Sequence, residues 1–148
     1  MTSLRDANQH AATIERIGAL RADSRAEWGK MTVPQMLAHC QRPLEVAAGE
    51  LTLKRGLIGF LLGKWAKKKF IIGDDPFQRN SPTDPKFLSP DAGDFERERD
   101  RLLELVKDYG EHGPRTTAPH PFFGPLTVEE WDRLMWKHLD HHLRQFGV

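Results

Sequence analysis

The sequence predicts an all-α fold, an antiparallel four-helix bundle with a long irregular crossover between the second and third long helices. Three observations support this fold class. Four segments repeat apolar residues with a helical period, two of them begin at a capping box, and no segment alternates as a strand would. The 148 residues suffice for one domain with a hydrophobic core, so we expect a single domain over residues 1–148.

The first two helices are predicted by different signals. A thin apolar stripe predicts the first over residues 3–25. The second begins at a capping box, with Thr32 as the N-cap and Gln35 three residues later, and runs to about residue 48, where Gly49 follows.

The second helix carries two residues that can ligate metals. His39 lies on its inner face, where it is either a hydrogen-bonded core histidine or a metal ligand. Cys40 lies about 100° further round the helix, and we interpret it as a packing residue.

Residues 51–73 form the predicted crossover and carry six basic residues and no acidic one. Three glycines, Gly56, Gly59 and Gly63, argue against a long stable helix. One interpretation is a basic amphipathic surface for anionic lipid, a partner or an acidic substrate. The favoured interpretation is a connecting element whose apolar side packs on the bundle while its lysines face water.

Two proline-rich loops are predicted on either side of the third long helix, which is expected over residues 91–109. The first loop, residues 74–90, lacks periodicity and can line or cover a pocket. The second, residues 111–125, holds His120 between two prolines. This histidine is either presented at the mouth of a site or is part of a structural loop.

The last helix is expected over residues 131–146, behind a capping box that begins at Thr127. At about 100° per residue, its apolar stripe continues through His138, His142 and Gln145. A buried stripe that changes from apolar to imidazole and amide groups is unusual, because an unpaired polar ring is costly inside a core.

His138 and His142 are four residues apart, so their rings lie one above the other and can hold one divalent metal ion. The alternative is a solvated pair that interacts with the helix dipole. With His39 as a third ligand, three neutral imidazoles leave coordination positions open, which is typical of a catalytic site. The residues that can orient the ligands or transfer protons are His120, His141 and Gln145.

Two motifs resemble a known superfamily. W-G-K-M-T-V-P-Q-M-L-A-H at residues 28–39 and H-L-D-H-H-L-R-Q at residues 138–145 resemble the DinB-like superfamily, also described as YfiT-like or thiol-S-transferase-like bundles. N-S-P-T-D-P at residues 80–85, H-P-F-F-G at residues 120–124 and the final K-H-L-D-H-H-L-R-Q-F-G resemble one bacterial branch of unknown function within it. The resemblance covers nearly the whole chain.

This resemblance implies an antiparallel four-helix bundle, often a homodimer, with one nickel or zinc ion held by three histidines in a cleft. Members with known activity use low-molecular-weight thiols such as bacillithiol or mycothiol, and others resemble metal-dependent hydrolases. By position the ligands are His39, His138 and His142, and Gln145 matches a glutamine that commonly follows the pair. The superfamily members differ in substrate, and no residues here match a thiol-recognition motif.

Composition narrows the expected partners. The net charge of +1 and the lack of a recognition helix or an aromatic-basic platform argue against nucleic acid. No apolar run reaches the roughly 18 residues of a transmembrane helix, so we expect no stable membrane association. One cysteine and an N-terminus without a signal-peptide pattern favour a cytoplasmic protein.

Two functions follow from these patterns and from the resemblance. The first is a metal-dependent enzyme that acts on a small-molecule substrate, as a thiol-dependent S-transferase or a hydrolase. The second is a non-catalytic, metal-stabilised stress-response or binding module that uses the basic segment, residues 51–73. An open coordination position favours the enzyme, whereas a fourth protein ligand such as His120 favours the module.

Overall fold

The computed structural model describes residues 2–89 and 91–148, so Met1 and Pro90, the last residue of the first predicted loop, lie outside the described residues. This part of the chain is all-helical and contains no named strand. Its α-helices are α1 (Ala7–Ala19), α2 (Val33–Ala48), α3 (Leu57–Ala66), α4 (Phe95–His112) and α5 (Val128–Gln145). A π-helix η1 (Lys67–Ile72) continues α3, and a 3-10 helix η2 (Pro85–Phe87) lies before α4.

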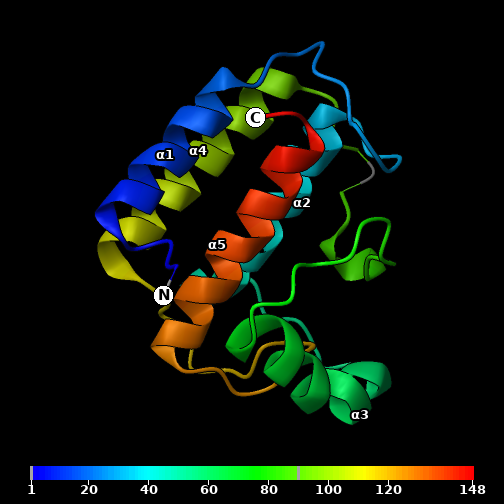
Figure 1. The fold of residues 1–148 in the computed structure, drawn as a ribbon, viewed down its shortest axis with the longest axis vertical. Helices are drawn as coiled ribbons and strands as arrows, with labels where there is room; N and C mark the ends of the chain where they lie inside the picture. Colours follow the sequence, from blue (N-terminus) through cyan, green and yellow to red (C-terminus); the bar gives the residue numbers. More distant parts are fainter. Residues whose placement is uncertain (1, 90) are drawn as a thin grey trace.

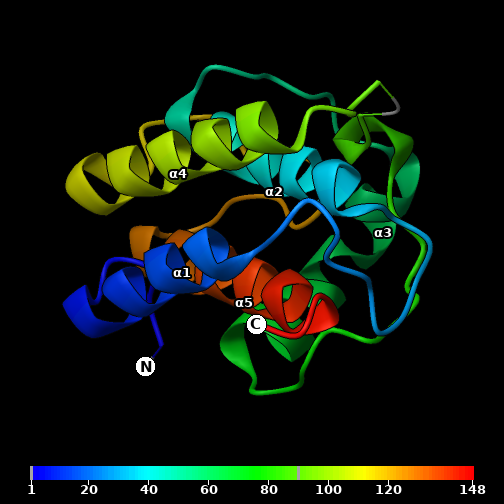
Figure 2. The same ribbon diagram turned by 90° about the horizontal axis from the view of Figure 1, so that it is seen from above.

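Four of the helices enclose the core. α2 packs against α4 and α5, and α1 packs against the same two helices. Figure 1 shows α1 beside α4 and α5 beside α2, and Figure 2 shows the same arrangement from above. Most of the largest fully buried side chains come from these four helices. Among the described helices, none is both long and apolar enough to cross a membrane.

Both predicted capping boxes are present. The Thr32 hydroxyl accepts from the Gln35 amide at 3.3 Å, and the Gln35 side chain accepts from the Thr32 amide at 3.0 Å. Thr127 and Glu130 make the same pair of bonds at 3.2 and 2.8 Å. Gly49 ends α2 in the left-handed conformation with φ of 79°. These local signals fix where the two site-bearing helices begin, and therefore which way their faces point.

The first helix is shorter than residues 3–25, because other groups end it. Asp6 caps its start by accepting from the Asn8 and Gln9 amides. Leu20 leaves the helical conformation at its end, with ψ of 146°.

The third long helix is shifted relative to residues 91–109. Asp94 caps its start by accepting from the Arg97 amide at 3.0 Å. Gly110 lies inside this helix, and its missing side chain makes room for the His10 ring of α1. The helix ends at Gly113, where φ is 67°.

The prediction of an irregular crossover over residues 51–73 was wrong, because residues 57–72 are helical. The glycines serve close packing instead of breaking the helix. A Cβ added to Gly59 would lie 2.9 Å from the Phe122 Cα, and one added to Gly63 would lie 2.2 Å from the Phe122 carbonyl oxygen. The absence of side chains at these positions therefore lets α3 lie directly against the loop that contains His120.

Candidate metal centre

The structure brings His39 of α2 together with His138 and His142 of α5. The three ring centroids are 4.7–4.8 Å apart. One ligand atom from each ring can be chosen so that all three lie within 4.8 Å of one another. The packing of α2 on α5 produces this triangle, since His39 is separated by 99 residues from His138.

His39 is held by a backbone group that the sequence did not reveal. Its Nδ1 lies 2.8 Å from the carbonyl oxygen of Phe87 in η2. A carbonyl can only accept, so Nδ1 carries the proton and Nε2 keeps its lone pair. This lone pair points to His138, whose Nε2 is 3.0 Å away. In the metal-free protein His138 therefore donates its Nε2 proton to His39.

His142 is oriented by a chain of two hydrogen bonds. The Gln145 amide nitrogen donates to the Trp28 carbonyl oxygen at 2.8 Å, which fixes the orientation of the amide group. The Gln145 Oε1 then accepts from the His142 Nδ1 at 2.8 Å, leaving the Nε2 lone pair of His142 free. Such partners fix both the tautomer and the ring orientation of metal-binding histidines.

Burial lowers the pKa of all three histidines. Desolvation is the largest cause for each, and the neighbouring imidazoles add to it for His138 and His142. The pKa of His142 falls to about 3, whereas the hydrogen bond to Phe87 partly offsets the lowering at His39. The rings are therefore neutral near pH 7, which is the form that binds metal ions.

The donor set fits a borderline divalent metal. Three uncharged imidazole nitrogens suit zinc, nickel, copper or iron, whereas magnesium and calcium prefer oxygen ligands. His39 and His142 are buried, and His138 is only partly buried. The imidazole of His138 is itself enclosed, so the exposed part of this residue does not by itself open the triangle to solvent.

The other predicted site residues surround this triangle without joining it. His120 is buried against the rings of Phe123 and Trp131, and Phe87 stacks parallel to it at 6.3 Å. Its Nδ1 accepts from the Phe122 and Phe123 amides at 3.0 and 3.2 Å. The burial argues against a freely presented histidine, and the two accepted bonds leave the proton on Nε2.

His141 lies beside the triangle on the flank of α5. It is partly buried, and its ring centroid is 5.0 Å from that of His142 and 5.7 Å from that of Trp28. Desolvation lowers its pKa, while Asp140 opposes this. Cys40 is fully packed against Met36, and burial raises the pKa of its thiol, as expected for a packing residue rather than a ligand.

Two groups that hold the site were missed from the sequence. Phe87 and Trp28 act through their backbone carbonyls, which have no side-chain signature. Phe87 ends the short 3-10 helix η2, and Trp28 lies in the loop between α1 and α2, so only the folded chain reveals which carbonyl meets which ring.

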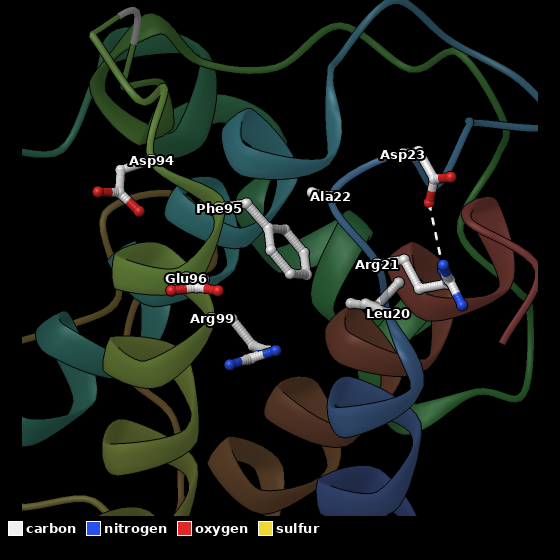
Figure 3. Close-up of a pocket in the computed structure, with 8 residues that line it drawn as sticks. All are labelled: Leu20, Arg21, Ala22, Asp23, Asp94, Phe95, Glu96 and Arg99. Carbon is white, nitrogen blue, oxygen red and sulfur yellow. Dashed lines mark hydrogen bonds and ion pairs between the residues drawn. The ribbon is translucent and has the colours of Figure 1, made fainter.

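A surface cavity of about 510 Å³ lies elsewhere, between the end of α1 and the start of α4 (Figure 3). Its two arginines already have neighbours. Arg21 pairs with Asp23 at 3.3 Å, and the Arg99 guanidinium covers the Phe95 ring at 5.3 Å. Its eight lining residues include no histidine or cysteine, so we do not place the functional site there.

The fold and the site define a class, an all-helical protein with an internal cluster of three histidines that could hold a metal ion. The chain belongs to the family described as "Protein of unknown function (DUF1569)", whose model matches residues 1–147. Neither the curated proteins nor the solved structures gave a match to the chain. The wider relationship to the DinB-like superfamily stays a prediction.

Proposed function

We propose that His39, His138 and His142 bind one divalent metal ion, nickel or zinc, and that the protein is a metal-dependent enzyme. The observation that carries the proposal is the convergence of three neutral imidazoles within 4.8 Å. Two of them are already oriented by hydrogen bonds from Nδ1, which leaves Nε2 for a ligand. A buried histidine needs a hydrogen-bond partner in any case, so the convergence of the three rings, and not these bonds alone, carries the proposal.

Three protein ligands would leave coordination positions open for water or a substrate. A divalent metal with three imidazole ligands supplies a Lewis acid that lowers the pKa of a water or thiol binding beside them. His120 offers its Nε2 proton, because its Nδ1 is occupied by two backbone amides. His141 is partly exposed and next to His142, so it can hydrogen-bond to a substrate that approaches from solvent.

The proposed substrate is a small molecule, and the proposed reaction is thiol-dependent S-transfer or hydrolysis. The thiol class rests on the DinB-like resemblance, as do the antiparallel four-helix bundle and the homodimer. The packing of α1, α2, α4 and α5 around one core supports the bundle. A cytoplasmic setting agrees with a single cysteine that is buried and free.

The direct test is metal content. Untagged protein purified without chelator should contain about one metal ion per chain by mass spectrometry. The His138→Ala variant should lose it, because two imidazoles bind more weakly than three. His112→Ala is the matched control, since His112 is exposed on α4 and bonded only to Asp108. Equal metal loss in both variants, or none in His138→Ala, would contradict the site.

A second experiment separates the enzyme from the non-catalytic module. Cobalt(II) is bound in place of the native metal, and its visible spectrum is recorded before and after addition of cysteine as a simple thiol. An open coordination position predicts a thiolate charge-transfer band. A four-ligand spectrum that ignores the thiol would instead assign a structural metal and the second function.

A further inference from the structure

Helix α3 turns its large apolar side chains away from the molecule. Six of them are between 50 % and 75 % exposed, namely Leu57, Ile58, Phe60, Leu61, Leu62 and Trp65. The buried residues of this helix are Gly59, Gly63 and Ala66. Single exposed leucines are ordinary, but six neighbouring large apolar residues on one helix mark an interaction surface. The expected burial of this apolar side against the bundle was therefore wrong.

The outward direction of this face is fixed by contacts on the opposite side. Gly59 and Gly63 lie so close to the backbone of Phe122 that a rotated helix would place side chains into it. Arg55 donates to the Gly59 carbonyl at 3.2 Å, and Lys67 bonds both Glu130 and the Pro125 carbonyl at 2.8 Å. Figure 1 shows α3 at the end of the molecule, projecting beyond the packed helices.

The surface around the exposed apolar residues is positively charged. Residues 51–73 contain no acidic side chain. Lys67 and Lys69 are paired with Glu130 and Asp75. Within residues 51–73, all of which the structure describes, the exposed lysines without an ion pair are Lys54, Lys64 and Lys68. An occupant of this face must therefore be apolar and negatively charged at the same time.

We propose that α3 and η1 form a docking surface for an anionic lipid bilayer, which they enter at the interface without spanning it. Leucine, phenylalanine and tryptophan on one side of a lysine-rich helix suit the boundary between headgroups and acyl chains. Lys64 and Lys68 then make ionic contacts with the lipid phosphates. A second copy of the chain fits worse, because a symmetric contact would bring the same lysines together.

This docking differs from the stable membrane association that the sequence argued against. It is reversible and salt-sensitive, because it depends on a short helix and on exposed lysines. It also stands apart from the proposed enzyme activity, since none of its residues is a candidate metal ligand. The two proposals can therefore fail independently.

Vesicle flotation tests the proposal. The vesicles are phosphatidylcholine alone, or one part phosphatidylglycerol to two parts phosphatidylcholine, at low salt. We expect the protein to float with the anionic vesicles, not with the neutral ones, and to be released by high salt. Absence of binding to the anionic vesicles at low salt would overturn the proposal.

Two paired variants assign the binding to this face. Lys64→Glu with Lys68→Glu should weaken it by at least about tenfold, while Lys30→Glu with Lys107→Glu, on exposed lysines elsewhere, should change it by less than about threefold. Equal losses would show an effect of net charge only and would overturn the docking surface.

The apolar side is tested by Phe60→Ser with Leu61→Ser, which should also lower binding by at least about tenfold. Both residues are exposed, so an unchanged melting temperature verifies the fold. Unchanged flotation of this variant would overturn the insertion of α3. A dimer in light scattering that this variant disperses would assign the face to a second copy and overturn the proposal as well.

Discussion

Helices α5 and α3 depart from ordinary burial in opposite directions. α5 buries His142 and Gln145 on the stripe where apolar residues normally lie. α3 exposes its large apolar residues and buries glycine and alanine. Folded proteins normally bury apolar residues and expose polar ones, so each of these two exceptions indicates a functional surface.

The two departures are stabilised differently. The polar residues of α5 at the histidine triangle find partners inside the protein, as in the chain of hydrogen bonds from His142 through Gln145 to Trp28. The large apolar residues of α3 remain exposed within the described chain, even where Arg55 lies over the Phe60 ring and Lys69 over the Trp65 ring, so we expect their partner outside it. Buried polar residues, the inward departure of α5, therefore indicate a site for a small ligand or ion. Exposed apolar residues, the outward departure of α3, indicate a surface for a large partner.

The strongest perturbation of the inward departure is His39→Ala. It removes the one proposed ligand from α2, and we expect the affinity for zinc or nickel to fall by more than about 100-fold. The metal-free variant should remain folded, because the other buried groups of α2 are unchanged. Isothermal titration and far-UV circular dichroism measure the two effects. Stoichiometric metal in the folded variant would remove His39 from the site.

The next largest effect is a pH dependence due to His120. Burial is the main cause that lowers its pKa to about 3 from an ordinary 6.5, and the Arg55 charge adds to it. Between these values the unfolded chain binds a proton that the folded chain does not. The free energy of unfolding therefore falls as the pH drops below 6.5, by about 1.4 kcal/mol per pH unit for this residue.

Urea unfolding of the metal-free protein at about pH 7 and about pH 5 measures this slope. The His120→Gln variant should lose the contribution of this one histidine, whatever its stability at pH 7. If the unfolding free energies of the wild type and the variant changed equally between these two pH values, His120 would be solvated rather than buried.

A smaller effect is expected from Gln145→Leu. It keeps the volume but removes the oxygen that orients His142, so the metal affinity should fall by roughly 10- to 100-fold. Gln145→Glu keeps an acceptor for His142 Nδ1 and loses the donor to Trp28. It should therefore retain more metal affinity than the leucine variant while losing stability. Equal affinities in the two variants would exclude an orienting role for Gln145.

The inward departure was visible in the sequence because α5 has a strong period. The capping box at Thr127 and the helical period placed His142 and Gln145 on the stripe that is buried in the structure, with His138 partly buried one turn earlier. The hydrogen bond from His39 to the carbonyl of Phe87 was not predictable, because only the folded chain brings this backbone oxygen next to His39.

The outward departure was not visible, because hydrophobic residues alone do not tell which way a helix faces. The apolar residues of α3 predicted burial, and its glycines predicted a break. The direction in which α3 faces is set by the contact between Gly63 and the backbone of Phe122, two residues far apart in the sequence. The sequence pattern does not contain this tertiary contact, which buries the glycine side of α3 and exposes its apolar side.

The smallest effects distinguish the two sides of α3 itself. Gly63→Ala places a methyl group 2.2 Å from the Phe122 carbonyl oxygen, so we expect a loss of about 1–3 kcal/mol in unfolding free energy. Gly18→Ala in α1 is the matched control, since nothing lies within 4 Å of its added Cβ and alanine favours a helix.

Leu61→Ser on the outer side should change the unfolding free energy by no more than about 0.5 kcal/mol, because Leu61 is 68 % exposed. Chemical denaturation of the three variants gives the comparison directly. If Leu61→Ser destabilised the protein as much as Gly63→Ala, the apolar residues of α3 would be packed in solution. The outward face, and with it the docking surface, would then be lost, while the three-histidine site would stand unchanged.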